Sequence, residues 1–213
     1  MNKIRVLLVD DHAILREGLR ALLSCYEDVQ VVGDASNGVI ALQKVEELEP
    51  DVVIMDIAMP VMDGLESTKR IRQKYPKVRV LILTQYQDKE YVLPLLQEGA
   101  AGFVLKQAMG TDLINAIRTV ASGSSFLYPA ITTVALEEIR HPSKDQSPND
   151  SLTPREREIL RYIVDGKTNQ QIAIILSLSA KTVDWHRTNL MGKLGIHSVA
   201  DLVRHALQHR LVE

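Results

Sequence analysis

Short runs of β-branched and aliphatic residues alternate with helical stretches through the first 122 residues. Each run is nearly continuous in apolar character, as expected of a strand that is buried on both faces. Because a helix follows each strand, the pattern predicts βα units and a parallel sheet with right-handed crossovers. We therefore expect an α/β fold with a five-stranded, doubly wound parallel sheet. The predicted strands are residues 4–9, 29–32, 52–55, 78–83 and 102–105, and the predicted helices are residues 14–24, 39–48, 64–74, 90–98 and 111–121.

The pattern changes after residue 123. Residues 130–140 allow one more helix, and residues 141–151 (HPSKDQSPNDS) are polar with two prolines, which indicates an exposed linker. Thr153, Pro154 and Glu156 then combine a capping box with a proline at the first helical position. Further helix starts are expected at Thr168, Ser179 and Ser198. The predicted organisation is an α/β domain at 1–122, a linker with a possible helix at 123–150, and an all-α four-helix domain at 151–213.

Composition narrows the functional classes. Hydrophobic residues make up 46% and charged residues 24%, which is ordinary for a globular protein. The first residues do not resemble a signal peptide, and no apolar run approaches the roughly 18 residues of a membrane span, so we expect a cytoplasmic protein. The single cysteine, Cys25, excludes an intramolecular disulfide. From residue 151 onward the net charge is +3, against −5 for the first 150 residues, and a mildly basic module suits a polyanionic partner.

Polar residues stand where the predicted strands end. Asp10 and Asp11 follow the first strand, Asp56 follows the third, and Thr84 and Lys106 end the fourth and fifth. Parallel topology can bring these ends to one edge of the sheet. Three close carboxylates repel one another unless a cation neutralises them, and Mg²⁺ prefers oxygen ligands. The set therefore predicts a magnesium site that supports phosphoryl transfer to an aspartate.

Each of these residues taken alone has an ordinary explanation. An Asp-Asp pair after a strand is commonly a helix cap, and a loop threonine or lysine is commonly solvated. Their occurrence together at successive strand ends favours a shared site. The segments that carry them, VLLVDDH, VVIMDIAMPVMDG, VLILT and GAAGFVLK, closely resemble the signature segments of response-regulator receiver domains. The resemblance covers about residues 3 to 122.

That resemblance implies a flavodoxin-like fold and specific roles at the acidic site. It makes Asp56 the phosphoacceptor and a metal ligand. Asp10 and Asp11 would be the pair that organises Mg²⁺, and Ala58 would contribute its backbone carbonyl.

The resemblance also implies a way to sense the phosphoryl group. Thr84 and Lys106 would contact the phosphoryl oxygens. Phe103 stands at the position of the aromatic switch residue, although an ordinary core phenylalanine is an alternative.

The last 61 or so residues resemble the LuxR-type helix-turn-helix of the NarL/FixJ class of response regulators. The resemblance is carried by LTPREREIL, by GKTNQQIAIILSLSAKTVDWHRTNLMGKLGI and by the final helix, with the two-helix motif at Asn169 to Thr188. At about 100° per residue, Val183, Leu190 and Leu194 form one stripe of the third helix, whose opposite face is free to enter a major groove. We assign groove contacts to Lys181, Asp184, Trp185 and Thr188, and phosphate contacts to Thr182, Arg187, Asn189 and Lys193.

Some of these DNA contacts have alternatives. Trp185 is equally compatible with a packing role, and Asp184 with solvation of the helix start. The ordinary interpretation of the charged residues on this helix is that they form a solubilising face. A tryptophan on such a polar face is unusual.

The two resemblances together imply a regulator rather than an enzyme. A histidine kinase, or a small acyl phosphate, would phosphorylate Asp56, and rearrangement around Thr84 and Phe103 would free or dimerise the domain that binds promoter DNA. The predicted dimer surface is on the final helix, at Leu202, Val203, Ala206 and Leu207.

Two alternatives remain. An aspartyl-phosphate phosphatase would use the same carboxylates, but Ala58 stands where its second aspartate is expected. A regulator that senses a small molecule would need an apolar cavity instead of an acidic rim.

Overall fold

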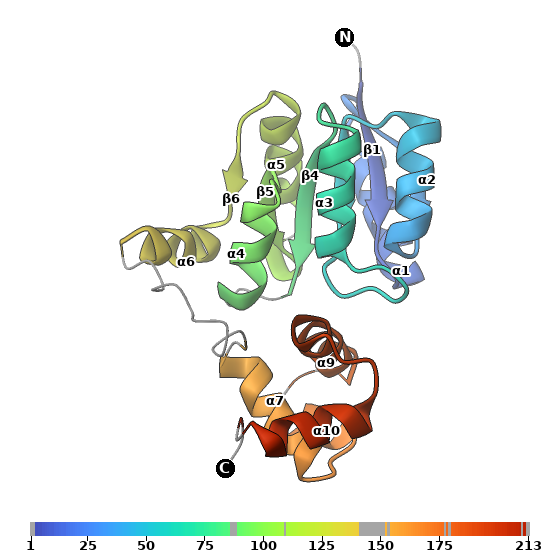
Figure 1. Ribbon diagram of the computed structural model, residues 1–213. Coiled ribbons are helices and arrows are strands. Elements are labelled where there is room, and N and C mark those ends of the chain that lie inside the picture. The colour runs from blue at the N-terminus through green and yellow to red at the C-terminus, as the bar shows by residue number, and fades with distance from the viewer. Residues whose placement is uncertain are drawn as a thin grey trace. The chain divides into compact units, whose positions relative to one another are not determined.

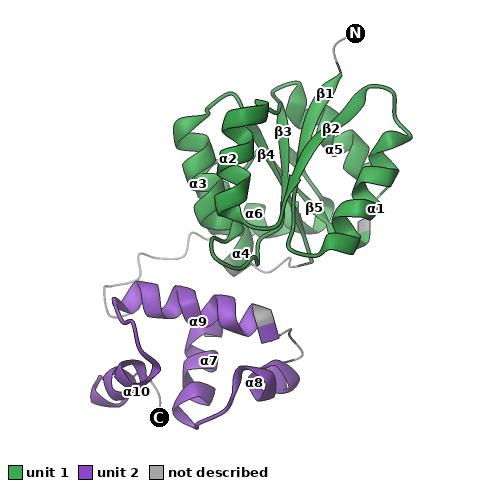
Figure 2. Ribbon diagram, turned by 90° about the vertical axis from the view of Figure 1, so that its right-hand side faces the viewer, with its two compact units in different colours: residues 1–142 green, residues 143–213 purple. Residues whose placement is uncertain are grey.

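The chain forms two compact units, residues 1–142 and residues 143–213 (Figure 2). They are called the first and second unit below. The computed structural model describes residues 3–85, 89–108, 110–140, 152, 154–176, 178, 180–209 and 211.

A parallel sheet forms the centre of the first unit, with the strand order β2-β1-β3-β4-β5-β6 (Figure 1). All five predicted strands are present. They are β1 (Ile4–Val9), β2 (Val29–Ala35), β3 (Val52–Met55), β4 (Arg79–Thr84) and β5 (Gly102–Leu105). β2 is longer than predicted because its pairing with β1 continues past a register shift and ends only at Val9 and Ala35.

Helices cover both faces of this sheet. α1 (Ala13–Ser24) and α5 (Thr111–Ala121) lie on one face, and α2 (Gly38–Leu48), α3 (Gly64–Lys74) and α4 (Lys89–Gln97) lie on the other (Figures 1 and 2). Successive strand residues such as Leu7 and Leu8 are both fully buried, because neighbouring side chains point to opposite covered faces. The expected doubly wound parallel sheet is confirmed.

A sixth strand was not predicted. β6 (Phe126–Leu127) pairs with β5, and the N–H of Tyr128 donates to the carbonyl of Phe103 at 3.1 Å. α6 (Pro129–Arg140) follows and packs against α4. The first unit therefore extends beyond residue 122, the predicted end of the α/β domain. A two-residue strand has no periodicity for sequence analysis to detect, since only its partner strand defines it.

The second unit contains α7 (Pro154–Val164), α8 (Asn169–Leu176), α9 (Ala180–Leu194) and α10 (Val199–Gln208). The capping box at the start of α8 is formed: Gln171 N–H donates to Thr168 Oγ1 at 3.3 Å, and Thr168 N–H donates to Gln171 Oε1 at 2.9 Å. Ser198 caps α10 by accepting from Asp201 N–H. The predicted caps Thr153 and Ser179, and the predicted linker at 141–151, lie outside the described residues.

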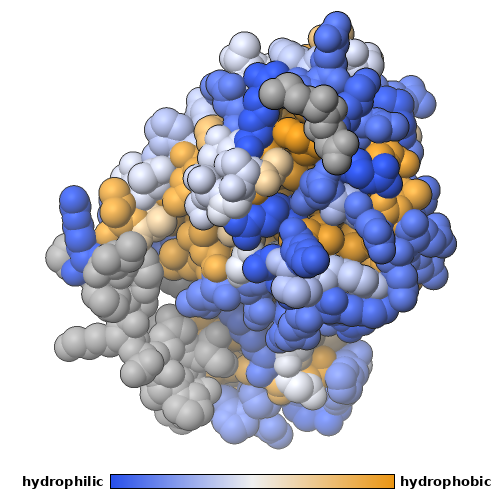
Figure 3. Space-filling view, turned by 90° about the horizontal axis from the view of Figure 1, so that it is seen from above, coloured by the Kyte–Doolittle hydropathy of each residue, from blue (hydrophilic) through white to orange (hydrophobic). Residues whose placement is uncertain are grey.

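No helix in the described ranges is both long and apolar enough to span a bilayer. The face in Figure 3 is covered largely by hydrophilic side chains, and hydrophobic residues show between them.

Candidate functional site

The predicted carboxylates meet at the carboxyl edge of the sheet. Asp10 and Asp11 follow β1 and Asp56 follows β3, and these strands are neighbours that end in register at Val9 and Met55. Oxygen atoms of the three carboxylates and a ring nitrogen of His12 all lie within 4.8 Å of one another, a cluster that could hold a metal ion.

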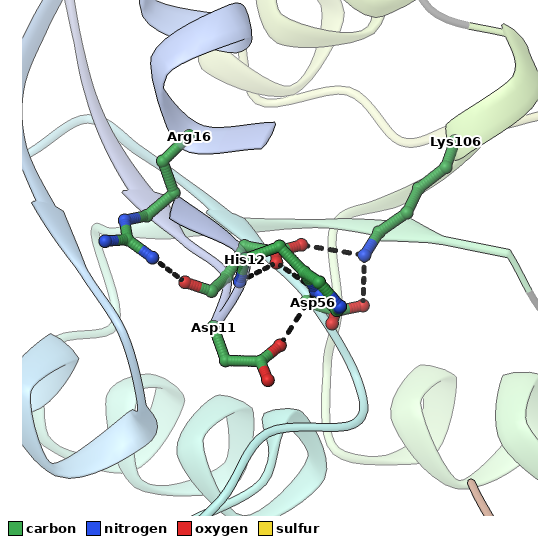
Figure 4. A network of polar contacts seen from close by, with 6 residues as sticks. Asp11, His12, Arg16, Asp56 and Lys106 are labelled. Carbon is green, nitrogen blue, oxygen red and sulfur yellow. Dashed lines mark hydrogen bonds and ion pairs between the residues drawn. The ribbon is translucent and has the colours of Figure 1, made fainter. Parts of the chain in front are cut away.

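Lys106 joins two of these carboxylates (Figure 4). It follows β5, and its Nζ lies 2.7 Å from Asp10 Oδ2 and 3.0 Å from Asp56 Oδ1. Asp10 and Asp56 are 3% and 5% exposed, so this ammonium compensates carboxylates that have little contact with water.

Two more of the predicted residues, Thr84 and Ala58, are also at this end of the sheet. Thr84 ends β4, between β3 and β5, and it is fully buried. Ala58 is buried in the loop after Asp56. Phe103 lies within β5 with no exposed surface, which suits both a switch residue and an ordinary core residue.

The loop after Asp56 is held close to the strand end. Gly64 N–H donates to the carbonyl of Ile57 at 2.8 Å, and Asp63 caps α3 by accepting from Glu66 N–H. A Cβ on Gly64 would lie 2.2 Å from the carbonyl oxygen of Asp56. Only glycine permits this approach, so Gly64 helps to set the position of Asp56.

In the second unit, α8 and α9 form the predicted two-helix motif. The Asn169 side chain at the start of α8 donates to Asp184 Oδ1 at 2.9 Å and accepts from Arg187 at 3.4 Å. Asp184 and Thr188 are exposed, and Trp185 is half-buried. The side chain of Lys181 is outside the described part of the chain.

Thr182 differs from its predicted role. It is fully buried, so the phosphate contact that we assigned to it is wrong for this conformation. The buried stripe of α9 is wider than the sequence indicated, because His186, one turn after Thr182, is buried as well. Lys193 remains half-exposed, but its Nζ lies 2.8 Å from Glu156 Oε2, so a phosphate would compete with this carboxylate.

The predicted dimer surface on α10 also needs correction. Leu202 and Ala206 are fully buried in the core of the second unit. Of the four residues we assigned, Leu207 is exposed and Val203 is half-buried.

Comparison with known proteins identifies both units. Residues 6–118 match the family described as the response regulator receiver domain, and residues 150–206 match the bacterial regulatory proteins of the luxR family. The chain belongs to the NarL/FixJ class of response regulators. It is thus a DNA-binding response regulator of a two-component system.

Individual relatives of this response regulator span its whole length. The oxygen regulatory protein NreC of Staphylococcus carnosus is 40% identical over 216 residues, which cover 99% of this chain and 100% of NreC. The response regulator ChrA of a heme-sensing two-component system is 33% identical, with all of both chains covered and a TM-score of 0.55. RcsB of Salmonella typhimurium is 28% identical, with 96% and 98% of the chains covered and a TM-score of 0.60.

The receiver carboxylates differ in their electrostatics. Burial raises the pKa of Asp56, and Asp10 adds to the rise, while Lys106 offsets only part of it. Burial also acts to raise the pKa of Asp10, but Lys106 and His12 hold that pKa below its usual value. Burial acts to lower the pKa of Lys106, but Asp56 and Asp10 raise it above its usual value. Lys106 is therefore charged at neutral pH, and Asp56 is the carboxylate whose ionisation the receiver disfavours.

Asp56→Asn is expected to raise the melting temperature of the metal-free receiver at pH 7. The folded-state pKa of Asp56 is raised, so at any pH above it the ionised Asp56 carboxylate destabilises the fold. This cost disappears when the pH falls below the unfolded-state pKa of about 3.9, because Asp56 is then protonated in both states. Each 1 kcal/mol of relief corresponds to roughly 3 °C. Calorimetry in a chelating buffer, at pH 7 and at acidic pH, measures the effect. If Asp56→Asn melts at a lower temperature than the wild type at pH 7, the assignment of Asp56 as a destabilising buried charge is wrong.

Sequence reasoning missed His12 and Arg16 in the receiver. His12 Nδ1 lies 3.0 Å from Asp10 Oδ1 and 3.1 Å from Asp11 Oδ1 (Figure 4). Arg16 donates to the carbonyl of Asp10 at 2.7 Å and to Asp34 at the end of β2 at 3.0 Å. The adjacency of His12 to the Asp pair was a usable signal. The role of Arg16 depends on the position of β2, which its sequence spacing does not give.

Proposed function

We propose that Asp56 accepts a phosphoryl group from a histidine kinase or a small acyl phosphate, and that this modification controls binding of the second unit to promoter DNA. The observation that carries the proposal is the contact of Lys106 with both Asp10 and Asp56. It provides a buried carboxylate nucleophile beside a fixed positive charge. Positioning and charge neutralisation of this kind are what phosphoryl transfer requires.

The chemistry is a displacement at phosphorus. An oxygen of Asp56 bonds to phosphorus as the P–N bond of a phosphohistidine, or the P–O bond of an acyl phosphate, breaks and the donor's imidazole or carboxylate leaves. In this proposal Lys106 moves from Asp56 to a phosphoryl oxygen, and the Thr84 hydroxyl donates to another.

The donor set of the acidic cluster fits Mg²⁺. Carboxylate oxygens of Asp10, Asp11 and Asp56 are close together, and the backbone carbonyl of Ala58 is the fourth protein ligand that we propose. When bound, the metal would supply positive charge against the phosphoryl oxygens. Lys106 contacts Oδ2 of Asp10 and Oδ1 of Asp56, so neither carboxylate gives both of its oxygens to the ammonium.

The signal then has to reach the DNA-binding helices. Two charge-assisted hydrogen bonds, from Thr84 and Lys106, contribute roughly 3 to 6 kcal/mol together, and reversing a 1:99 equilibrium takes about 5.5 kcal/mol. We propose that rearrangement at Phe103, together with dimerisation, completes the switch.

In the proposed complex α9 enters the major groove. Groove contacts come from Lys181, Asp184, Trp185 and Thr188, and phosphate contacts from Arg187, Asn189 and Lys193. A structure of RcsB is a complex with DNA, and another has two RcsB dimers on two DNAs. Because its ligand is promoter DNA, the proposed place of action is the cytoplasm. A regulatory role without substrate turnover is part of this proposal.

The test is intact-mass and peptide mass spectrometry of the full chain after incubation with acetyl phosphate and Mg²⁺. We expect one phosphoryl group on Asp56 and none on Asp56→Asn. Asp51→Asn is the matched control, because Asp51 is exposed at the opposite end of β3 and this variant should still be phosphorylated. DNA selected with the phosphorylated protein should bind it more tightly than Asp56→Asn. Phosphorylation at another residue, or equal uptake by Asp56→Asn, would overturn the proposal.

A further inference from the structure

We propose that the His12 imidazole is a direct metal ligand, which makes the receiver site favour Mn²⁺ and other transition-metal dications over Mg²⁺. This inference rests on the proposed metal site at Asp10, Asp11 and Asp56, and it concerns which ion that site selects.

The spacing of the ligand atoms supports direct coordination. In an octahedral shell with bonds of about 2.1 Å, neighbouring ligand atoms lie about 3.0 Å apart. His12 Nδ1 lies 3.0 Å from Asp10 Oδ1 and 3.1 Å from Asp11 Oδ1. The nitrogen is therefore already as far from each oxygen as adjacent members of one coordination shell are from each other.

Lys106 does not occupy this part of the site. Its Nζ contacts Asp10 through Oδ2, whereas His12 approaches Oδ1 of the same carboxylate. Asp10 thus offers one oxygen to the ammonium and the other to the imidazole. A cation on the His12 side would add to the charge of Lys106 without displacing it.

The backbone of His12 holds the ring over the carboxylates. His12 is the N-cap residue of α1, but its side chain makes no cap hydrogen bond. Its N–H instead donates to Asp10 Oδ1 at 2.8 Å, and Arg16 fixes the carbonyl of Asp10. The side chain of His12 is 63% exposed, so its ring can adjust to a bound cation without rearrangement of the core.

The ligand type determines the selectivity. Mg²⁺ is a hard ion that is bound in proteins by oxygen and water, and imidazole suits transition metals better. Three carboxylates alone hold either kind of ion. A nitrogen added to them gives the larger gain to Mn²⁺, and a still larger gain to ions later in the Irving–Williams order.

The test measures binding of Mn²⁺ to the full chain by electron paramagnetic resonance, with Mg²⁺ as competitor. We expect His12→Ala to lower the ratio of Mn²⁺ affinity to Mg²⁺ affinity roughly tenfold. This is the lower end of the loss in metal affinity that follows when a residue supporting a metal ligand is mutated. Pulsed measurements on bound Mn²⁺ should show nitrogen-14 modulation in the wild type and none in His12→Ala. His197→Ala is the control, because His197 is an exposed histidine of the second unit and its removal should leave both readouts unchanged.

The outcomes separate this inference from the proposed function. Bound Mn²⁺ without nitrogen modulation in the wild type, or an unchanged affinity ratio in His12→Ala, overturns the role of His12 and leaves the carboxylate site intact. Absence of divalent-ion binding, or binding that Asp11→Asn does not weaken, overturns both the metal site and the role of His12.

Discussion

Gly64→Ala is expected to destabilise the first unit by about 3 kcal/mol, the upper end of the usual cost of an extra methyl group in a packed interior. The new Cβ would lie 2.2 Å from the carbonyl oxygen of Asp56 and 2.9 Å from Cα of Ile57. Both are backbone atoms, so no side-chain rotation can relieve the clash. The loop must move, and it carries the phosphoacceptor that we propose.

Gly18→Ala is the matched control for this substitution. Gly18 lies within α1, and a Cβ there would meet no atom within 4 Å. Alanine should stabilise the helix by up to about 1 kcal/mol. Urea unfolding of the two variants should therefore shift in opposite directions, and only Gly64→Ala should also slow phosphoryl uptake from acetyl phosphate. Equal stability of Gly64→Ala and wild type would show that the loop after Asp56 is not tightly packed.

The strand ends explain why much of the acidic site was predictable. Buried parallel strands are nearly continuous apolar runs, so the positions of Asp10, Asp56 and Lys106 relative to their strands could be read directly from the sequence. Parallel topology then brought these ends to one edge of the sheet. No knowledge of side-chain conformation was needed for that step.

What the sequence did not predict depends on tertiary context. β6 exists because two residues pair with β5, and the position of the His12 ring is set by the bend between β1 and α1. Thr182 appeared accessible because helical periodicity defines a single stripe, whereas the core of the second unit buries α9 more widely. An apolar stripe on a helix can pack within its own unit or against a second copy of the chain. In this structure Leu202 and Ala206 pack within their own unit, which makes them unavailable for a dimer.

The second unit should lose stability on mild acidification because of His186. This residue is 1% exposed on α9, and its pKa is lowered to about 4, first by burial and then by the nearby charges of Arg155 and Lys193. The folded unit therefore holds His186 neutral, while the unfolded chain protonates it near pH 6.5. The contribution of neutral His186 to the stability of the second unit is fully present above about pH 6.5 and is lost as the pH falls to about 4.

The expected size of this effect is large for a small domain. The full shift corresponds to about 3 kcal/mol, of which about 2 kcal/mol should be lost between pH 7 and pH 5. Total stabilities of single domains are often only about 5 to 15 kcal/mol. Acidification to pH 5 should therefore remove a substantial part of the free energy of unfolding.

Trp185 provides the measurement, because it is the only tryptophan and belongs to the second unit. Its ring centroid lies 5.0 Å from that of His186. Urea unfolding followed by tryptophan emission at pH 7 and pH 5 should show the loss in the wild type. His186→Gln should remove most of the difference between the two pH values, whatever its stability at pH 7, because the buried group no longer titrates. His197→Gln should retain the difference, since His197 is exposed. A pH dependence that persists in His186→Gln would assign the acid sensitivity to other groups.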